Sequence, residues 1–579
     1  MTIVKPLPAT KWKIKNTLNK DIENSLSNEF GIHPIISQIL ANREFPDMED
    51  VRHYLYPSLK DLYNPFLMQD MKIGISRFLK AIYNHEKIVI YGDYDADGIT
   101  SVAILYKFIK EIALDVTYYI PDRLLEGYGL KNPAIDIFKQ NNISLIITVD
   151  CGISDNEQIA YAQSMGIDTI VLDHHAISGA LPPAIANINP NRTDCAFPFK
   201  ELAGVGIAYN FLIALRGTLR KEGFWNNKDY PNLKEYLDIV ALGTIGDIAQ
   251  LTDENRIFVK IGLELITEGK RPGIKALKEI SGVDGQIIDS FKASFCLIPR
   301  INAAGRIASP LDAVSLLLTE DIEEARKLAA KLDGYNRSRQ TMEKTILNEI
   351  LAIISGDPNL EKKDALVFAS DKWHPGVVGI VASRLVDLFS RPAFVISLKD
   401  GIGKGSGRSI TDFNIYNGIQ QCSSLLLSFG GHNYAAGISI KEDEIATFTN
   451  LLNEIIRSTC QFSDSVSQTI IDSECQLQDI DMNFINQMQL LAPFGSKNPE
   501  PILCARNIKV SSPTVVGNNH LKMCLSSNGM SRNSIWFTMG HYRNAVAGAN
   551  LDIVFTPQIN QWNGASDIQL KMKDVTILS

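Results

Sequence analysis

The chain has 579 residues, which is too long for one hydrophobic core and predicts three or four domains. Hydrophobic residues make up 45% and charged residues 21%, as in ordinary globular proteins, and no apolar run is long enough to span a bilayer. The net charge of −8 excludes a general attraction to nucleic acid, so a polyanion would have to bind at local basic patches or bound metal.

The first residues and the cysteines narrow the class of protein further. Residues 1–15 lack the apolar stretch of a secretory signal, so we expect a cytoplasmic protein that does not bind membranes. The eight cysteines include no CxxC pair, so neither a zinc site nor a disulfide framework is indicated.

Strand and helix patterns alternate over residues 86–318, after a helical N-terminal region in residues 1–85 that leads into the first sheet. The predicted strands are residues 87–91, 116–120, 144–149 and 169–172, and helices follow the first three at residues 100–112, 133–140 and 156–165. This is the pattern of βαβ units. It predicts an α/β domain with a mostly parallel sheet and helices on both faces.

Three acids, Asp93, Asp95 and Asp97, lie on the turn after the first strand. In an open α/β sheet this is the edge at which ligands bind. Carboxylates this close resist ionising unless a cation lies among them, and Mg²⁺ and Mn²⁺ prefer oxygen ligands. The alternative is an acidic surface turn that caps a helix.

Later strand ends add candidate ligands at the same edge. Asp150 follows the third strand, and His174 and His175 follow the fourth. Asp247 interrupts an apolar helical run, where an acid without a partner would be costly to bury. The set suits two divalent cations bridged by a shared carboxylate, with these candidate ligands: Asp95, Asp97, Asp150, His174 and Asp247.

The motifs DYDADG, VDCGI, LDHH and GTIGDIA, in this order, resemble the first four motifs of the DHH phosphoesterase superfamily. From about residue 45 onward the chain is similar to bacterial single-strand-specific 5′→3′ exonucleases of that superfamily. The resemblance implies that the five candidate ligands bind two Mn²⁺ or Mg²⁺ ions. It also implies that Asp95, Asp97 and His175 are catalytic, with His175 either contacting the phosphate or transferring a proton. Tyr91 stands where pyrophosphatase-type members have a histidine, which leaves Asp93, water or substrate to complete one metal site.

Two further segments predict substrate contacts in this domain. In IPDRLLEGYGL, Arg123 could hold a phosphate and Tyr128 could stack on a base, although such residues are often structural. CLIPRINAAGR resembles the superfamily's fifth motif, and we expect Asn302 and Arg306 to contact a phosphate that closely approaches the small residues 302–305. The alternative for this segment is a helix start with surface arginines.

A long helical pattern rich in charge pairs covers residues 319–356 and predicts a helix that links two domains. A second α/β domain is predicted over residues 357–460, and it resembles the substrate-binding DHHA1 domain. Its glycine-rich residues 403–409, with Ser406 and Arg408, predict an oxyanion cradle. A second compact turn contains Gly431 and His432, which we also expect to bind substrate.

Five short alternating strands in residues 466–579 predict a β-barrel of the OB-fold type. Such barrels bind single strands through basic grooves and aromatic side chains. The candidates for these contacts are Arg506, Lys509, Lys522, Trp536 and Trp562, and the alternative for the aromatic side chains is a place in the barrel core.

Taken together, these features predict a metal-dependent exonuclease that cuts single-stranded DNA from the 5′ end. The resemblance implies a role in DNA repair and recombination, cooperation with a DNA helicase and a single-strand-binding protein, and a monomeric enzyme. Selectivity for single strands would follow from a passage between the two α/β domains that is too narrow for a duplex. Two alternatives remain: a DHH phosphodiesterase for short oligoribonucleotides or cyclic dinucleotides, and a non-catalytic DNA-binding scaffold of the same fold.

Overall fold

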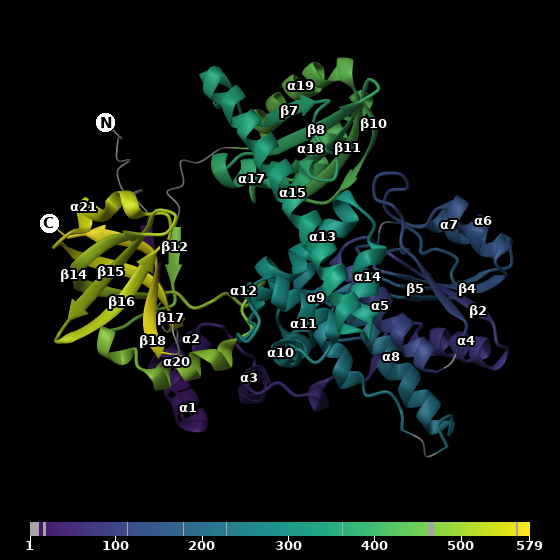
Figure 1. The fold of residues 1–579 in the computed structure, drawn as a ribbon, viewed down its shortest axis with the longest axis horizontal. Coiled ribbons are helices and arrows are strands. Elements are labelled where there is room, and N and C mark those ends of the chain that lie inside the picture. Colours follow the sequence, from purple (N-terminus) through teal and green to yellow (C-terminus); the bar gives the residue numbers. More distant parts are fainter. Residues whose placement is uncertain are drawn as a thin grey trace. The chain divides into compact units, whose positions relative to one another are not determined.

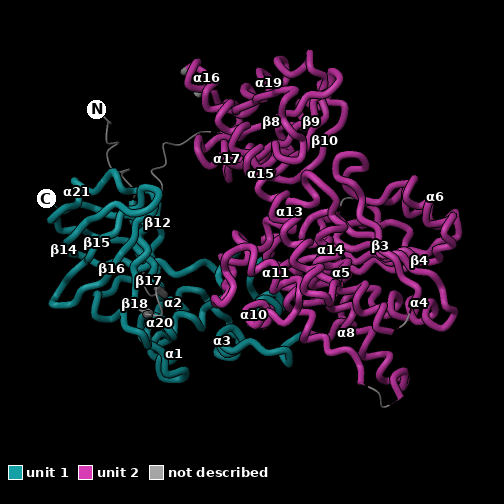
Figure 2. Tube along the Cα trace, viewed as in Figure 1, with its two compact units in different colours: residues 1–62, 250–260, 464–579 teal, residues 63–249, 261–463 magenta. Residues whose placement is uncertain are grey.

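The computed structural model describes residues 11–15, 19–112, 114–177, 179–226, 229–361, 363–460, 468–562 and 565–578. The chain forms two compact units, shown in two colours in Figure 2. The smaller unit contains residues 1–62, 250–260 and 464–579, and the larger contains residues 63–249 and 261–463. Within the described ranges, no helix has both the length and the apolar character needed to cross a membrane.

The larger unit contains a five-stranded, fully parallel sheet in the order β3-β2-β4-β5-β6. Figure 1 labels β2, β4 and β5 of this sheet. Its strands are β2 (Lys87–Gly92), β3 (Val116–Tyr119), β4 (Ile143–Val149), β5 (Asp168–Leu172) and β6 (Ala186–Ile188). The first four confirm predicted strands. The three residues of β6 are too few to show an alternating pattern, so this strand has no counterpart among the predictions.

Helices cover both faces of this sheet, as the βαβ pattern predicts. On one face, α6 (Asn132–Gln140) and α7 (Asn156–Ser164) bury Phe138 and Ile159 against Ile146 of the sheet. On the other face lie α4 (Met71–Tyr83), α5 (Ala96–Glu111) and α8 (Gly204–Lys221). Because all five strands are parallel, their carboxyl ends meet at one edge, where the acidic loops begin.

Further short helices and one π-helical turn also lie in this part of the larger unit. They are α9 (Leu237–Gly246), α11 (Pro272–Ile280), α12 (Ser290–Lys292), η4 (Ala293–Leu297), α13 (Ile298–Ile307) and α14 (Leu311–Leu318). α10 (Asp253–Glu268) begins among residues of the smaller unit and ends among residues of the larger one.

The predicted linking helix is α15 (Ile322–Gly356), which has 35 residues and is about 50 Å long. Asp321 caps it by accepting hydrogen bonds from the backbone N–H groups of Glu323 and Glu324. Its first half packs on α11, α13 and α14, whereas Ile346 and Ile350 lie in a second core with α17 (Val378–Phe389). One helix therefore belongs to two cores, which makes it a structural link and not a solvated spacer.

The second sheet has the order β10-β11-β9-β8-β7, in which only the β7–β8 pair is parallel. Its strands are β7 (Leu366–Ser370), β8 (Ala393–Lys399), β9 (Ile402–Arg408), β10 (Leu426–Gly431) and β11 (Ala435–Lys441). One face packs on α15 and α17, and the other packs on α18 (Ile415–Gln421) and α19 (Ile445–Thr459). α16 (Pro358–Glu361) precedes the sheet.

The glycine-rich residues 403–409, which we predicted as a cradle, lie in strand β9 up to its last residue, Arg408. A Cβ on Gly405 would lie 2.8 Å from the Ile438 side chain, and one on Gly407 would lie 2.4 Å from the Phe394 ring. The glycines therefore make room for large side chains of the neighbouring strands. Side chains alternate along a strand, so Ser406 and Arg408 share the opposite face. Gly431, predicted in a second compact turn, likewise ends strand β10.

The smaller unit contains the C-terminal barrel, which closes through the β14–β17 pair and confirms the five predicted strands. They are β14 (Leu503–Val516), β15 (His520–Ser527), β16 (Met530–Trp536), β17 (Asn550–Trp562) and β18 (Ala565–Ile577). Shorter elements flank the barrel: β12 (Gln468–Ile471), β13 (Ser473–Glu474), α20 (Met482–Met488) and α21 (Arg543–Val546).

The N-terminal helices belong to this barrel unit, although we expected them to lead into the first sheet. α1 (Lys20–Phe30), α2 (Pro34–Ala41) and α3 (Met48–Leu55) bury Leu26, Leu40 and Leu55 in one core with barrel residues such as Phe555. β1 (Lys11–Ile14) pairs with β12 in parallel. The two ends of the chain therefore fold as one body.

Candidate metal centre

The loop after β2 presents its acids in fixed orientations. Asp95 is the N-cap of α5, and its Oδ1 accepts hydrogen bonds from the backbone N–H groups of Asp97 at 2.9 Å and Gly98 at 3.2 Å. The carboxylate of Asp97 accepts the N–H groups of Gly204 at 2.7 Å and Val205 at 2.8 Å, in the first turn of α8. Helix N-termini favour negative charge, so both carboxylates are held where they can face a cation.

His174 lies among three carboxylates. Its Nε2 is 3.1 Å from Asp150 Oδ1 and 3.9 Å from Asp97 Oδ2, and its Nδ1 is 3.8 Å from Asp247 Oδ2. Asp247 reaches this place as the C-cap of α9. Four of the predicted ligands, which are far apart in sequence, therefore meet at one edge of the sheet.

Two groups of ligand atoms could each hold a cation. One group is Asp97, His174 and Asp247, and the other is Asp93, Asp95 and Asp150; within each, the ligand atoms lie within 4.8 Å of one another. Asp150 also groups with His174 and His175, so it can bridge two ions. In the described part of the chain, the buried Asp93 Oδ1 has no hydrogen-bond partner. A bound cation would satisfy this oxygen, so the oxygen-rich set fits Mg²⁺ or Mn²⁺.

The electrostatics of the cluster agree with this fit. Burial, reinforced by the neighbouring carboxylate of Asp95, raises the pKa of Asp97 to about 7. Burial and the other acids also raise the pKa of Asp247 to about 8 and the pKa values of Asp93 and Asp150 well above the usual range. Without cations, Asp97 and Asp247 retain protons near neutral pH, and cation binding must displace them.

His174 and His175 have opposite protonation preferences. Burial and the neighbouring His175 lower the pKa of His174 to about 4, so its imidazole is neutral and suited to metal ligation. Burial also opposes the charge on His175, but a 2.7 Å hydrogen bond between its Nδ1 and Asp173 Oδ1 outweighs burial and raises the pKa of His175 to about 9. The buried Asp173 thus positions a charged imidazole. Its only sequence signal was its place at a strand end before two histidines.

Comparison with known proteins agrees with this arrangement. The sequence matches the DHH family N-terminal domain over residues 87–244, the DHHA1 domain over residues 362–458 and the RecJ OB domain over residues 471–574. It is 37% identical to the single-stranded-DNA-specific exonuclease RecJ of Bacillus subtilis over 98% of this chain and 71% of that protein. It is 34% identical to the Escherichia coli protein of the same name over 92% of this chain and 95% of that protein.

The chain belongs to the RecJ family.

A solved structure also agrees with this assignment. The crystal structure of RecJ in complex with Mn²⁺ from Thermus thermophilus matches with a TM-score of 0.82 at 27% identity. The match covers 98% of this chain and 79% of that chain. A RecJ of that organism has also been solved in complex with Mg²⁺, and that structure matches with a TM-score of 0.76.

Tyr91 and Tyr128 lie at the first sheet of this RecJ family member, in two different settings. Tyr91 is fully buried and its hydroxyl donates to the Gly129 carbonyl, so it offers no ligand in place of the histidine of pyrophosphatase-type members. Tyr128 is 43% exposed, and its hydroxyl lies 3.3 Å from the Asp150 carbonyl and 3.2 Å from His175 Nδ1. The predicted base-stacking residue is therefore next to the cluster of acids.

Four arginines converge beside the acids. Burial, with the positive charges of Arg123, Arg339 and Arg408, lowers the pKa of Arg306 to about 10. Burial and Arg123 also lower the pKa of Arg408. The Arg123 guanidinium lies 4.9 Å from the centroid of the Tyr94 ring. Tyr94 is in the loop of residues 93–97, which is the predicted metal-binding loop. Crowded guanidinium groups of this kind are suited to a phosphate. Arg339 was not predicted, because it lies in a helix where charge pairs are common; it pairs with Glu343 at 2.6 Å.

The other predicted substrate contacts lie in varied settings. Asn302 Oδ1 accepts the backbone N–H of Ala96 at 2.8 Å, so this side chain supports the metal-binding loop. Ser406 Oγ accepts from Arg408 at 3.1 Å, beside the arginine cluster. Gly431 and His432 are exposed in the β10–β11 hairpin, and no described contact joins them to the metal cluster, so their role stays a prediction.

Gly305 admits a backbone segment where we expected a phosphate. A Cβ at this position would lie 1.9 Å from the Tyr94 carbonyl oxygen, between Asp93 and Asp95. We expect Gly305→Ala to lower the free energy of unfolding by about 2 kcal/mol and to weaken Mn²⁺ binding, because the metal-binding loop must shift. Thermal unfolding and titration calorimetry would measure both effects.

Gly334 in α15 provides the matched control, because nothing lies within 4 Å of a Cβ built there. Gly334→Ala should stabilise the chain by up to about 1 kcal/mol and leave Mn²⁺ binding unchanged. Unchanged Mn²⁺ affinity in Gly305→Ala would contradict the proposed contact between α13 and the loop.

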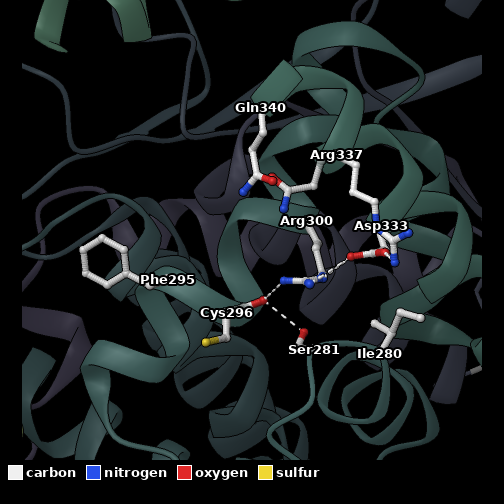
Figure 3. Close-up of a pocket in the computed structure, with 9 residues that line it drawn as sticks. Ile280, Ser281, Phe295, Cys296, Arg300, Asp333, Arg337 and Gln340 are labelled. Carbon is white, nitrogen blue, oxygen red and sulfur yellow. Dashed lines mark hydrogen bonds and ion pairs between the residues drawn. The ribbon is translucent and has the colours of Figure 1, made fainter. Parts of the chain in front are cut away.

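A pocket of about 290 Å³ is lined by residues of α11, η4, α13 and α15, among them Arg300 and Asp333 (Figure 3). Arg300, which flanks the fifth motif, donates to the Cys296 carbonyl and pairs with Asp333 at 2.8 Å. Asp333 also pairs with Arg337 at 2.5 Å, and Ser281 donates to the Cys296 carbonyl at 3.0 Å. These charged and polar groups satisfy one another, which favours a structural role for Arg300.

The barrel candidates divide by exposure. Arg506, Lys509 and Lys522 are exposed, although Arg506 also pairs with Asp552 at 2.8 Å. Trp536 is only 4% exposed and stacks on Tyr542, so its prediction as a base platform is wrong: the ring belongs to the core. The Trp562 side chain lies outside the described residues.

The raised pKa values predict how pH changes the stability of the metal-free protein. Between about pH 4 and pH 8 the folded state holds protons on Asp97 and Asp247 that the unfolded state has released, so the free energy of unfolding should fall as pH rises. Cations bind the deprotonated cluster, so stabilisation by Mn²⁺ should be larger at pH 8 than at pH 6. Thermal unfolding with and without Mn²⁺ at both pH values measures this. A Mn²⁺ effect independent of pH would contradict it.

Proposed function

We propose that the chain is a single-stranded-DNA-specific exonuclease that hydrolyses phosphodiester bonds from the 5′ end, with two Mn²⁺ or Mg²⁺ ions as cofactors. The observation that carries this proposal is the meeting of Asp97, Asp150, His174 and Asp247 beside an arginine cluster. Membership of the RecJ family supports it, since the relatives are named single-stranded-DNA-specific exonucleases.

The acids and histidines have separate tasks in this proposal. Asp97, His174 and Asp247 would hold one cation and Asp93 and Asp95 the other, with Asp150 close enough to contribute to both sites. When bound, the cations supply Lewis-acid activation of the attacking water and neutralise charge on the phosphate. His175 is held by Asp173 through Nδ1, so its Nε2–H is available to a phosphate oxygen or to the leaving oxygen.

The arginine cluster supports the 5′ polarity. Arg123, Arg306 and Arg408 bring more positive charge than an internal phosphate, with its single negative charge, needs. A terminal phosphate monoester carries about two negative charges near neutral pH. We therefore assign the cluster to a 5′-terminal phosphate, which would place a bond near that end at the metal centre.

The barrel supports an extended single-stranded substrate. The exposed side chains of Arg506, Lys509 and Lys522 can follow a phosphate backbone, as basic grooves of OB-folds do. Cooperation with a DNA helicase and a single-strand-binding protein, a role in DNA repair and recombination, a cytosolic location and a monomeric state belong to the same proposal.

The experiment compares substrates under one condition. With Mn²⁺, a 5′-phosphorylated DNA single strand should be degraded from its 5′ end, as shown by early release of a 5′ label and late shortening of a 3′-labelled strand. A DNA duplex, an RNA single strand and a dinucleotide should react much more slowly, and chelation should stop all cleavage. Preferred turnover of dinucleotides would favour a phosphodiesterase for short substrates, and binding without any cleavage would favour a scaffold.

A further inference from the structure

Ile248, the residue after Asp247, has a backbone conformation that isoleucine rarely adopts. Its φ is 59°, in the left-handed region. The N–H of Ile248 donates to the Ile245 carbonyl at 3.1 Å, and the N–H of Ala249 donates to the Thr244 carbonyl at 3.2 Å. These two bonds form a Schellman motif that ends α9, in which the left-handed position is usually glycine. A β-branched side chain makes this conformation unfavourable.

Packing does not compensate for this backbone strain. The Ile248 side chain is 76% exposed, so it buries little apolar surface in the fold. Most described non-glycine residues with positive φ are asparagine, aspartate or serine, which tolerate the conformation better. A residue that breaks a local rule without a gain for the fold indicates a functional constraint.

The location of Ile248 points to that function. Consecutive Cα atoms are about 3.8 Å apart, so Ile248 is anchored next to a predicted metal ligand. The Asp247 carboxylate itself lies 3.8 Å from His174 Nδ1, inside the cluster. A phosphate at this cluster brings its attached nucleosides close to Asp247, and the neighbouring Ile248 is exposed to solvent.

We propose that Ile248 is a substrate contact, whose side chain packs against the sugar and base of a nucleoside next to the cleaved phosphate. This inference rests on the proposed nuclease function. An aliphatic side chain makes no hydrogen bond, so the contact is independent of base identity, as a nuclease that degrades any sequence requires. The exposed side chain would leave water only when the strand binds, so the contact should act on binding of the strand and little on the chemical step.

The test is Ile248→Gly, which removes the side chain and relieves the strain together. We expect KM for a long single strand to rise about tenfold, with kcat within about twofold of wild type. The melting temperature should rise by about 2 °C, and Mn²⁺ affinity by calorimetry should not change. Ile248→Val keeps a branched aliphatic side chain and should keep the wild-type KM.

Ser390→Gly is the matched control. Ser390 is the exposed C-cap of α17, which begins at Val378, and its φ of 52° is also in the left-handed region. The Ser390→Gly variant should be more stable than the wild type and have an unchanged KM. An Ile248→Gly variant with the wild-type KM, a reduced Mn²⁺ affinity or a lower melting temperature would overturn the inference. Failure of the wild-type chain to degrade any single strand would instead overturn the proposed function.

Discussion

Asp150→Asn should abolish hydrolysis and leave a metal-free fold that is more stable than the wild type. Asp150 belongs to two of the three candidate metal groups, so losing its charge affects both cation positions. We expect kcat/KM to fall by at least about 10³-fold, since stabilisation by both ions depends on it. Asparagine tolerates the left-handed backbone of Asp150, where φ is 58°, so the loop should keep its shape.

The stability gain has a separate physical cause. Burial and the surrounding acids Asp97, Asp95 and Asp93 raise the pKa of Asp150 well above its usual range, so in chelator a neutral amide replaces an unfavourable buried acid. Steady-state kinetics and thermal unfolding in chelator measure the two effects. Asp136→Asn, a change on α6 at an acid that pairs with Tyr161, should alter neither. Substantial activity in purified Asp150→Asn would contradict the metal assignment.

The first sheet and the position of its acids could be predicted, because a parallel topology brings the carboxyl ends of all strands to the same edge. Once residues 87–91, 144–149 and 169–172 are parallel neighbours, the residues that follow them must share one edge. The position of Asp247 was harder to predict, because this residue lies at the end of a helix and not of a strand. Its place among the acids followed only from the resemblance to a known superfamily and from the cost of burying an acid without a partner.

The features that sequence did not predict depend on contacts between distant segments. The glycines in residues 403–407 suggest a turn when only the sequence is considered. In the fold they lie beside Phe394 and Ile438 of the neighbouring strands, and these large side chains leave no room for a Cβ. Likewise, helices α1–α3 carry ordinary apolar faces, and nothing local shows that these faces match a barrel formed several hundred residues later. Local patterns specify elements, whereas the partners of those elements are set by complementary packing.

Arg408→Ala should remove the preference for a 5′-phosphate. Burial and the positive charge of Arg123 lower the pKa of Arg408, so two guanidinium groups lie close together in a buried place. If a terminal phosphate balances them, kcat/KM on 5′-phosphorylated DNA should fall about a hundredfold in the variant, the usual cost of removing one partner of a buried charge pair. On 5′-hydroxyl DNA the same substitution should lower kcat/KM only a few-fold, because a 5′-hydroxyl end carries no phosphate monoester charge.

Competition kinetics with the two oligonucleotides measure this ratio directly. Arg384→Ala is the matched control: Arg384 lies on α17 in the same sheet domain, is 59% exposed and pairs with Glu343 at 3.3 Å. It should retain the wild-type preference, since a charge pair at the surface contributes little. An equal loss on both substrates would mean that Arg408 supports the fold or the passage of the strand, and the 5′-terminal phosphate would have to bind elsewhere.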